Sequence, residues 1–153
     1  MPTTLLAIES SCDETAVAIL RRDQGKAEVL SSKISSQIDI HREFGGVVPE
    51  LASRNHSLNL RPLIEAALEE AQLDIHSMDA FAATAGPGLA SSLLVGNTTA
   101  KSLAVATGKP FISVNHMEGH LLSPFLEQAE LRSNLALIVS GGHTLLILSL
   151  IHI

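Results

Sequence analysis

Short runs of apolar residues alternate with polar residues at the start of the chain. Two β-prone runs, "TTLLAIESS" and "TAVAIL", are separated by the polar stretch "SSCDE". Apolar runs bounded by turn-forming residues are typical of β-strands joined by a turn. A third run, "AEVLSSKISSQ", follows closely. The pattern therefore predicts three strands in an antiparallel meander.

The spacing of apolar residues becomes helical after the turn "EFGGVVPE". Residues three and four positions apart share one face of a helix, and this spacing predicts a helix over about residues 49–72. Pro62 lacks an N–H and crowds the preceding turn, so we expect it to kink or restart the helix. The apolar positions are Leu51, Leu58, Leu60, Leu63, Ile64, Ala67, Leu68 and Ala71.

The middle of the chain predicts alternating strands and helices. "AFAATAG" is an apolar run that ends at the tight turn "GPG", residues 86–88, and predicts a buried strand. Residues 89–107 predict a second helix, and "KPFISVN" predicts a further strand. Because a helix joins the two strands, we expect them to be parallel. A last helix starts at about His116 and is limited or kinked by Pro124. Small residues that permit close packing of the second helix are Ala90, Ser91, Gly96, Ala100 and Ala104.

Composition supports a folded α/β domain. The chain has 153 residues, of which 46% are hydrophobic and only 3% aromatic, with no Trp or Tyr. Such a core must consist of Leu, Ile, Val and Ala, as in sheets covered by helices. The length is sufficient for one ordinary domain.

Charge and cysteine content exclude several classes of protein. The net charge is −6, and the ten Lys and Arg residues are scattered, so the chain lacks the basic surface of a protein that binds nucleic acid unaided. Cys12 is the single cysteine and cannot form an internal disulfide. No apolar run is long enough to cross a membrane, and the start has no basic leader. We therefore expect a cytoplasmic protein without a membrane partner.

Two segments far apart in the sequence share one pattern. "LLAIESSCDETAVAIL" near the start and "LALIVSGGHTLLILSL" near the end are both apolar strands around a turn of small and polar residues. The repeat indicates a duplicated, two-lobed fold whose turns face each other across a phosphate-binding cleft, although strand-turn-strand is also a common motif in α/β proteins. The first lobe is predicted over residues 1–130, and residues 131–153 begin a second lobe.

The stretch "NHMEGHLLSP" places two histidines four residues apart. On a helix, His116 and His120 lie one turn apart and can direct both imidazoles at one metal ion, or they can be two histidines that merely share a face. Glu118 points to the opposite face and is a poor third ligand. A zinc protease needs a glutamate directly after the first histidine, where this chain has Met117, which argues against a protease.

Several turn residues are further candidates. Ser140, Gly141 and Gly142 allow a ligand to approach the backbone, although an ordinary Gly-Gly turn explains them equally. Asp13 and Glu14 lie in the first turn. They are either residues of the cleft or ordinary carboxylates exposed to solvent. The "GPG" turn can offer helix amides to an anion, but we favour a role in turning the chain.

Other polar residues are given ordinary structural roles. We expect Cys12 to be buried rather than nucleophilic, and Lys101 to be a charge on a helix surface. The remaining histidines show no partner spacing and are expected on the surface or on helix faces: His41, His56, His76 and His152.

Six stretches taken together resemble the TsaD family of tRNA threonylcarbamoyltransferases, formerly described as O-sialoglycoprotein endopeptidases. They are "IESSCDET", "HREFGGVVPELASRNH", "TAGPGL", "LLVG", "NHMEGHLLSP" and "VSGGHT", in order over about residues 4–148. The resemblance implies the two-lobed fold of actin, Hsp70 and sugar kinases, with an RNase H-like lobe. It also implies an N-terminal fragment, because complete members are roughly twice as long. The final "LIHI" departs from the family pattern.

The resemblance also implies a reaction and its components. The family transfers a threonylcarbamoyl group from threonylcarbamoyl-AMP to the exocyclic amine of the adenosine beside the anticodon, in tRNAs that read ANN codons. His116 and His120 would bind one iron or zinc ion, with an aspartate from the absent half as third ligand. The run Ile138, Val139, Ser140, Gly141 and Gly142 would bind the substrate, and His143 and Thr144 flank it. No catalytic side chain is assigned.

Partners and alternatives follow from the same resemblance. Bacterial members work with a TsaB-like paralogue and a TsaE-like ATPase that help present tRNA, which agrees with the acidic charge of the chain. The alternatives are an O-carbamoyltransferase of related fold and a non-catalytic TsaB-like scaffold; the histidine pair argues against the scaffold. We expect the chain alone to be inactive, with exposed strand edges that favour aggregation.

Overall fold

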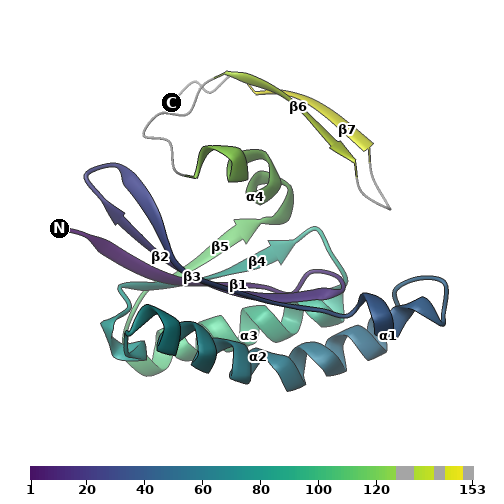
Figure 1. Ribbon diagram of the computed structural model, residues 1–153, viewed down its shortest axis with the longest axis horizontal. Helices are drawn as coiled ribbons and strands as arrows, with labels where there is room; N and C mark the ends of the chain where they lie inside the picture. The colour runs from purple at the N-terminus through teal and green to yellow at the C-terminus, as the bar shows by residue number, and fades with distance from the viewer. Residues whose placement is uncertain (127–132, 140–143, 150–153) are drawn as a thin grey trace.

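A computed structural model describes residues 1–126, 133–139 and 144–149 (Figure 1). It contains seven strands and four α-helices in the described residues, with 3₁₀ turns at Ile75–Ser77 and Ser123–Phe125. The elements are β1 (Thr3–Glu9), β2 (Glu14–Asp23), β3 (Lys26–Ser36), α1 (Ile38–Arg42), α2 (Pro49–Ala71), β4 (Ala80–Gly86), α3 (Ala90–Thr107), β5 (Phe111–Asn115), α4 (His116–Leu122), β6 (Asn134–Val139) and β7 (Thr144–Ser149).

Five strands form one mixed sheet in the order β3-β2-β1-β4-β5. The pairs β1–β2 and β2–β3 are antiparallel, which confirms the predicted meander. The pairs β1–β4 and β4–β5 are parallel, which confirms the direction predicted for "KPFISVN". The α/β fold class is therefore correct. Three parallel strands, β1, β4 and β5, end at the same edge of the sheet.

Helices α2 and α3 pack side by side on one face of the sheet (Figure 1). Strand residues alternate between the two faces, so β1 and β2 direct every second side chain at these helices. The resulting core excludes water and stabilises the fold by roughly 1.5–3 kcal/mol for each large apolar side chain that is fully buried. Its buried members include Leu6, Ile8, Val17, Ile19, Leu60, Ala67, Phe81, Ala100 and Ala104.

Helix α3 touches the sheet through a stripe of small residues at four-residue spacing: Ser92, Gly96, Ala100 and Ala104 are all buried. A Cβ added at Gly96 would lie 2.5 Å from the Ser10 hydroxyl oxygen and 3.1 Å from a methyl group of Ile8. The close packing predicted for Gly96, Ala100 and Ala104 is confirmed. It is wrong for Ala90 and Ser91, which are exposed because the buried stripe passes through Ser92 instead.

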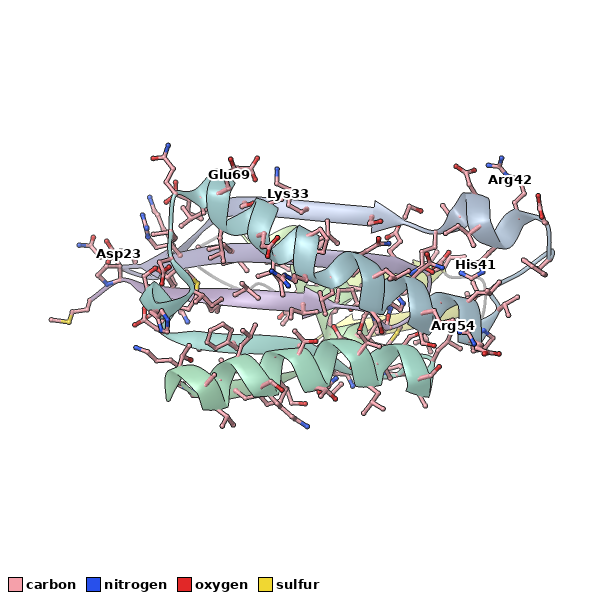
Figure 2. All side chains as sticks on the ribbon, turned by 90° about the horizontal axis from the view of Figure 1, so that it is seen from below. Asp23, Lys33, His41, Arg42, Arg54 and Glu69 are labelled. Atoms are coloured by element: carbon pink, nitrogen blue, oxygen red, sulfur yellow. The ribbon has the colours of Figure 1, made fainter. Side chains whose placement is uncertain are left out.

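Helix α2 continues through Pro62 without restarting. The prediction of a restart is wrong, because Pro62 lies on the exposed side of the helix, where water can bind the carbonyl that loses its intrahelical partner. Figure 2 views the molecule from the helix side and shows charged side chains such as Arg54 and Glu69 on the surface of α2. The helix ends at Gln72, which adopts a left-handed conformation.

The last two strands form a separate antiparallel hairpin, β6–β7, and β6 contacts α4 (Figure 1). The two strands of the second predicted strand-turn-strand motif are therefore present, and its turn lies outside the described residues. Several large apolar side chains of this hairpin are exposed, among them Leu135, Leu137, Leu146 and Leu148. The predicted lobe boundary at residue 130 lies outside the described residues and stays a prediction. Over the described residues, no helix is both long and apolar enough for a membrane span.

Candidate functional site

Helix α4 begins where β5 ends, and Asn115 forms its N-cap. The Asn115 side-chain oxygen accepts hydrogen bonds from the backbone N–H groups of Met117 at 2.9 Å and Glu118 at 3.3 Å. Such a cap satisfies amides that have no partner within the helix. His116 is thereby placed as the first residue of α4, at the edge of the sheet where the parallel strands end.

The two imidazoles of α4 converge. The Nε2 atoms of His116 and His120 lie 3.1 Å apart, and the ring centroids are 4.5 Å apart with the rings nearly perpendicular. The prediction that both rings point the same way is confirmed. His120 is exposed, whereas the His116 side chain is only 28% exposed. The pair therefore forms the solvent-facing side of a site.

The carboxylate of Glu9 lies behind His116. Glu9 is the last residue of β1, and its Oε2 is 3.4 Å from Nδ1 of His116. The Ser11 N–H donates a hydrogen bond to Oε1, and the Thr84 hydroxyl donates one to Oε2; each donor–acceptor distance is 2.5 Å. Burial alone raises the pKa of Glu9, but the hydrogen bonds from Ser11 and Thr84, helped by His116, outweigh it and lower the pKa below its usual value. The carboxylate is thus held in its charged form.

Ser11 contacts the same ring nitrogen and is fixed by the turn "GPG". Its hydroxyl oxygen is 3.2 Å from Nδ1 of His116, and its carbonyl accepts the N–H of Leu89 at 2.8 Å. A Cβ added at Gly88 would lie 2.7 Å from both the Cβ and the carbonyl oxygen of Ser11. Gly88 is therefore needed for this close approach. The favoured role of the turn, to redirect the chain, agrees with the structure, and anion binding there is untested.

The donor set fits a zinc or iron ion at His116 and His120. Metal–nitrogen bonds of about 2.0–2.1 Å place two ligand nitrogens of a tetrahedral ion roughly 3.3 Å apart, close to the observed separation. Imidazole nitrogens suit both metals, and a carboxylate behind one ring is a common supporting feature. Among the described residues, no group of three His, Cys, Asp or Glu side chains is placed to hold an ion. A third ligand would have to come from elsewhere.

The other turn residues of the first hairpin lie beside this site. Asp13 is partly buried and its carbonyl accepts the Gln37 N–H at 2.9 Å, whereas Glu14 is exposed at the start of β2. Cys12 is exposed, so the prediction of a buried thiol is wrong: the turn directs it to solvent. Partial burial and the charge of Asp13 raise the pKa of the Cys12 thiol, which disfavours the nucleophilic thiolate.

Two of the histidines expected on the surface or on helix faces do lie on helices, but with their side chains buried. His56 of α2 is fully buried and His41 of α1 is 3% exposed. In Figure 2, Arg42 projects from the end of α1 while His41 lies on the inner side. The partner of His56 is Thr15 of β2, 41 positions away, which no local spacing could reveal. The partner of His41 is Gln37, four positions before it, a local spacing that the sequence analysis did not use. His76 is exposed, as expected.

The predicted substrate-binding run is only partly described. Ile138 and Val139 end strand β6, and Thr144 begins β7. Ser140, Gly141, Gly142 and His143 lie outside the described residues, as does His152. Lys101 is exposed on α3, with its ammonium 5.2 Å from the centre of the Phe111 ring, which confirms its place on a helix surface.

Sequence reasoning missed three residues of the site: Glu9, Ser11 and Thr84. The available signal was position, because Glu9 and Thr84 lie at or near the carboxyl ends of strands that turn out to be parallel neighbours, where ligand sites of α/β sheets occur. That adjacency depends on strand order, which the apolar pattern did not specify.

Fold and site together define the class of the protein. A five-stranded mixed sheet with two helices on one face, followed by a second hairpin, is a lobe of the actin-like α/β class. A sequence profile of the family described as "TsaD: tRNA N6-adenosine threonylcarbamoyltransferase" matches residues 28–151. The chain belongs to the TsaD family.

Curated relatives carry the same description. The tRNA N6-adenosine threonylcarbamoyltransferase of Kosmotoga olearia is 53% identical over 146 residues, which cover 95% of this chain and 43% of that protein. The protein of that description from Nostoc punctiforme is also 53% identical, over 95% of this chain and 41% of its own length. The chain therefore spans about two fifths of the length of these relatives.

Solved structures share the fold at low sequence identity. YeaZ from Pseudomonas aeruginosa superposes with a TM-score of 0.61 at 21% identity, over 96% of this chain and 65% of that one. The Aquifex aeolicus PPX-GPPA enzyme gives a TM-score of 0.53 at 11% identity, over 94% of this chain and 47% of that one. These likenesses establish the fold alone.

Proposed function

We propose that the protein to which this chain belongs is a tRNA threonylcarbamoyltransferase of the cytoplasm. It would move the threonylcarbamoyl group from threonylcarbamoyl-AMP to the exocyclic amine of the adenosine beside the anticodon, in tRNAs that read ANN codons. Membership of the TsaD family and the names of the relatives support this activity. The observation that carries it is the convergence of the His116 and His120 Nε2 atoms at 3.1 Å.

The described residues support a metal-assisted transfer. An iron or zinc ion bound by His116 and His120 would act as a Lewis acid toward the threonylcarbamoyl group. Oε2 of Glu9 lies 3.4 Å from Nδ1 of His116, where its negative charge would balance the charge of the ion. The run of residues 138–142 would bind the adenylate through main-chain amides. The mechanism then needs no side-chain nucleophile, which agrees with the raised pKa of Cys12.

The alternatives differ in acceptor or in the absence of chemistry. A TsaB-like scaffold would have no use for a converging histidine pair, so His116 and His120 argue against it. An O-carbamoyltransferase of related fold would use the same pair but modify a small hydroxyl acceptor. Assays with tRNA and with small alcohols as competing acceptors distinguish the two enzymes.

The partners are proposed on the same basis. The net charge of −6 supports a need for help in binding tRNA, for which we propose a TsaB-like paralogue and a TsaE-like ATPase. An apolar groove between α2 and α3 would provide a surface for the paralogue, and Leu94, which lines it, is 65% exposed. Apolar residues that line the groove include Leu60, Ile64, Leu68, Val95 and Leu103.

The experiment compares this chain with a chimera. The chimera joins residues 1–149 to the remaining segment of the Kosmotoga olearia relative, and both proteins are given threonylcarbamoyl-AMP, unmodified tRNA and the two partners. We expect modified adenosine with the chimera and none with the chain alone. His116→Ala in the chimera should abolish transfer. Modification by the His116→Ala chimera at the unsubstituted rate would refute the role of the metal, and transfer only to small alcohols would refute the tRNA substrate.

A further inference from the structure

The Nδ1 atom of His116 faces two oxygen atoms. Oε2 of Glu9 lies 3.4 Å away and Oγ of Ser11 3.2 Å away. An ionised carboxylate can only accept hydrogen bonds, whereas a hydroxyl can donate or accept. A hydrogen on Nδ1 satisfies both oxygens, and its absence would leave a lone pair directed at a carboxylate.

We propose that Glu9 is a positioning residue that holds His116 in the tautomer with hydrogen on Nδ1, so that Nε2 presents its lone pair beside His120. This inference rests on the metal-assisted function proposed above. The other nitrogen of a metal-binding imidazole commonly donates to a carboxylate or carbonyl, which sets the tautomer and orients the ring. Glu9 has the position that this role requires.

The Glu9 carboxylate is itself fixed by groups of the sheet edge. Oε1 accepts the N–H of Ser11 and Oε2 accepts the hydroxyl of Thr84, so each oxygen has a donor from a different segment. Thr84 belongs to β4 and Glu9 to β1, which are neighbours in the parallel part of the sheet. A rotation of the carboxylate away from His116 would break both hydrogen bonds. The orientation of the imidazole is therefore linked to the main sheet rather than to α4 alone.

The second histidine completes the arrangement. With hydrogen on Nδ1, the Nε2 of His116 accepts from Nε2–H of His120 across 3.1 Å when no ion is bound. For both Nε2 atoms to bind one ion, His120 would have to carry its hydrogen on Nδ1 instead. Loss of such a supporting carboxylate typically weakens metal binding by roughly 10–100-fold.

The test combines tautomer and metal affinity in Glu9→Gln. Ring ¹⁵N shifts of His116 in the metal-free 153-residue chain report the tautomer, and zinc affinity is measured by competition with a chromophoric chelator. We expect Glu9→Gln to shift His116 from the Nδ1–H form toward the Nε2–H form, because the amide can donate to Nδ1. Zinc affinity should fall by roughly 10–100-fold. An unchanged tautomer with unchanged affinity overturns the proposal.

Three variants separate Glu9 from other causes. Glu118→Gln removes an exposed carboxylate from α4, the helix that carries His116 and His120. It should change neither the tautomer nor the zinc affinity. Thr84→Val keeps Glu9 but removes one of its hydrogen-bond donors, and should weaken zinc binding by a few-fold. If Glu9→Gln does not fold, this variant tests the proposal in its place. Ser11→Ala keeps the backbone donor to Glu9 and removes only the hydroxyl. A tautomer change in Ser11→Ala but not in Glu9→Gln would assign the role to Ser11 and overturn the proposal.

The outcomes also separate this inference from the proposed function. Because the tautomer is read in the metal-free chain, it does not depend on transfer activity. A chimera that fails to modify tRNA while Glu9→Gln shows both effects would refute the function and leave the role of Glu9 intact. If the chimera is active but Glu9→Gln changes neither the tautomer nor the zinc affinity, the function stands and the role of Glu9 is refuted.

Discussion

His56 donates a hydrogen bond from Nε2 to the carbonyl oxygen of Cys12, 3.0 Å away. Because a carbonyl can only accept, Nε2 carries the hydrogen and Nδ1 of the neutral ring is an acceptor. The Thr15 hydroxyl at 2.7 Å and the Gln37 amide nitrogen at 3.2 Å both donate to Nδ1. The fully buried ring is therefore satisfied in its neutral form.

The hydrogen bonds continue to the second buried histidine. Nδ1 of His41 accepts the Val48 N–H at 3.3 Å, so its Nε2 donates to the Gln37 side-chain oxygen at 3.2 Å. The Gln37 amide nitrogen also lies 3.4 Å from the carbonyl of Ala52. One glutamine thus joins α1 to α2, and through His56 to the turn that carries Ser11, Cys12 and Asp13.

Acid should destabilise the fold through His56. Burial lowers the pKa of His56 in the folded chain below its value of roughly 6.5 in the unfolded chain. The unfolded state therefore binds more protons, and the stability present above about pH 6.5 is lost as the pH falls toward the lowered pKa. Urea unfolding at about pH 7.5 and about pH 5.5 should show the loss, at most about 1.4 kcal/mol per pH unit from this group.

Two histidine variants isolate that contribution. His56→Gln should be less stable at neutral pH but show a smaller decrease between the two pH values. His76→Gln alters an exposed ring and should leave the decrease unchanged. Equal decreases in all three proteins would contradict the assignment to His56.

Gly96→Ala should destabilise the contact between α3 and β1. The added methyl group would lie 2.5 Å from Oγ of Ser10, which accepts the Gly96 N–H and donates to the Ser92 carbonyl. Overpacking of this kind costs about 1–3 kcal/mol. The free energy of unfolding in urea measures it. At Gly46 no heavy atom lies within 4 Å of an added Cβ, so Gly46→Ala is the matched control and should cost little.

His120→Ala should remove zinc binding without loss of stability. One imidazole of the pair is deleted, and a single neutral imidazole holds zinc poorly. His120 is exposed, so its replacement should change the free energy of unfolding by less than about 0.5 kcal/mol. Chelator competition and urea unfolding check the two statements. Zinc affinity equal to that of the unsubstituted chain would place the ion elsewhere.

Leu94→Asp should weaken binding to a TsaB-like paralogue. The side chain lines the groove between α2 and α3 and is 65% exposed, and a charge there would be desolvated in an interface. We expect at least a roughly 30-fold loss of affinity, as for an interface hot spot worth about 2 kcal/mol. Titration calorimetry with the paralogue measures it. Val105→Asp, on the same helix and 83% exposed but outside the groove, is the control; equal losses in both variants would contradict the assignment of the groove.

Much of the fold could be predicted because its signals are local. The alternation in "TTLLAIESS" and the helical spacing after "EFGGVVPE" each depend on residues only a few positions apart. The histidine pair is also local, since one turn of helix separates His116 from His120. The errors at Pro62 and Cys12 concerned surroundings: water on one side of α2 and the outward direction of a turn.

The rest depended on strand order. Amino-acid order by itself determined the strands, the long helices, the converging imidazoles and the resemblance to the TsaD family. Only the tertiary structure decided that Glu9 meets Thr84 and His116, which are 75 and 107 positions away in the chain, and that His56 is buried against Thr15. The contacts of Glu9 exist because parallel pairing of β1 with β4, and of β4 with β5, brings three strand ends to one edge. The contact between His56 and Thr15 exists because α2 packs on β2. Apolar periodicity carries no information about which strands become neighbours or which helix covers them.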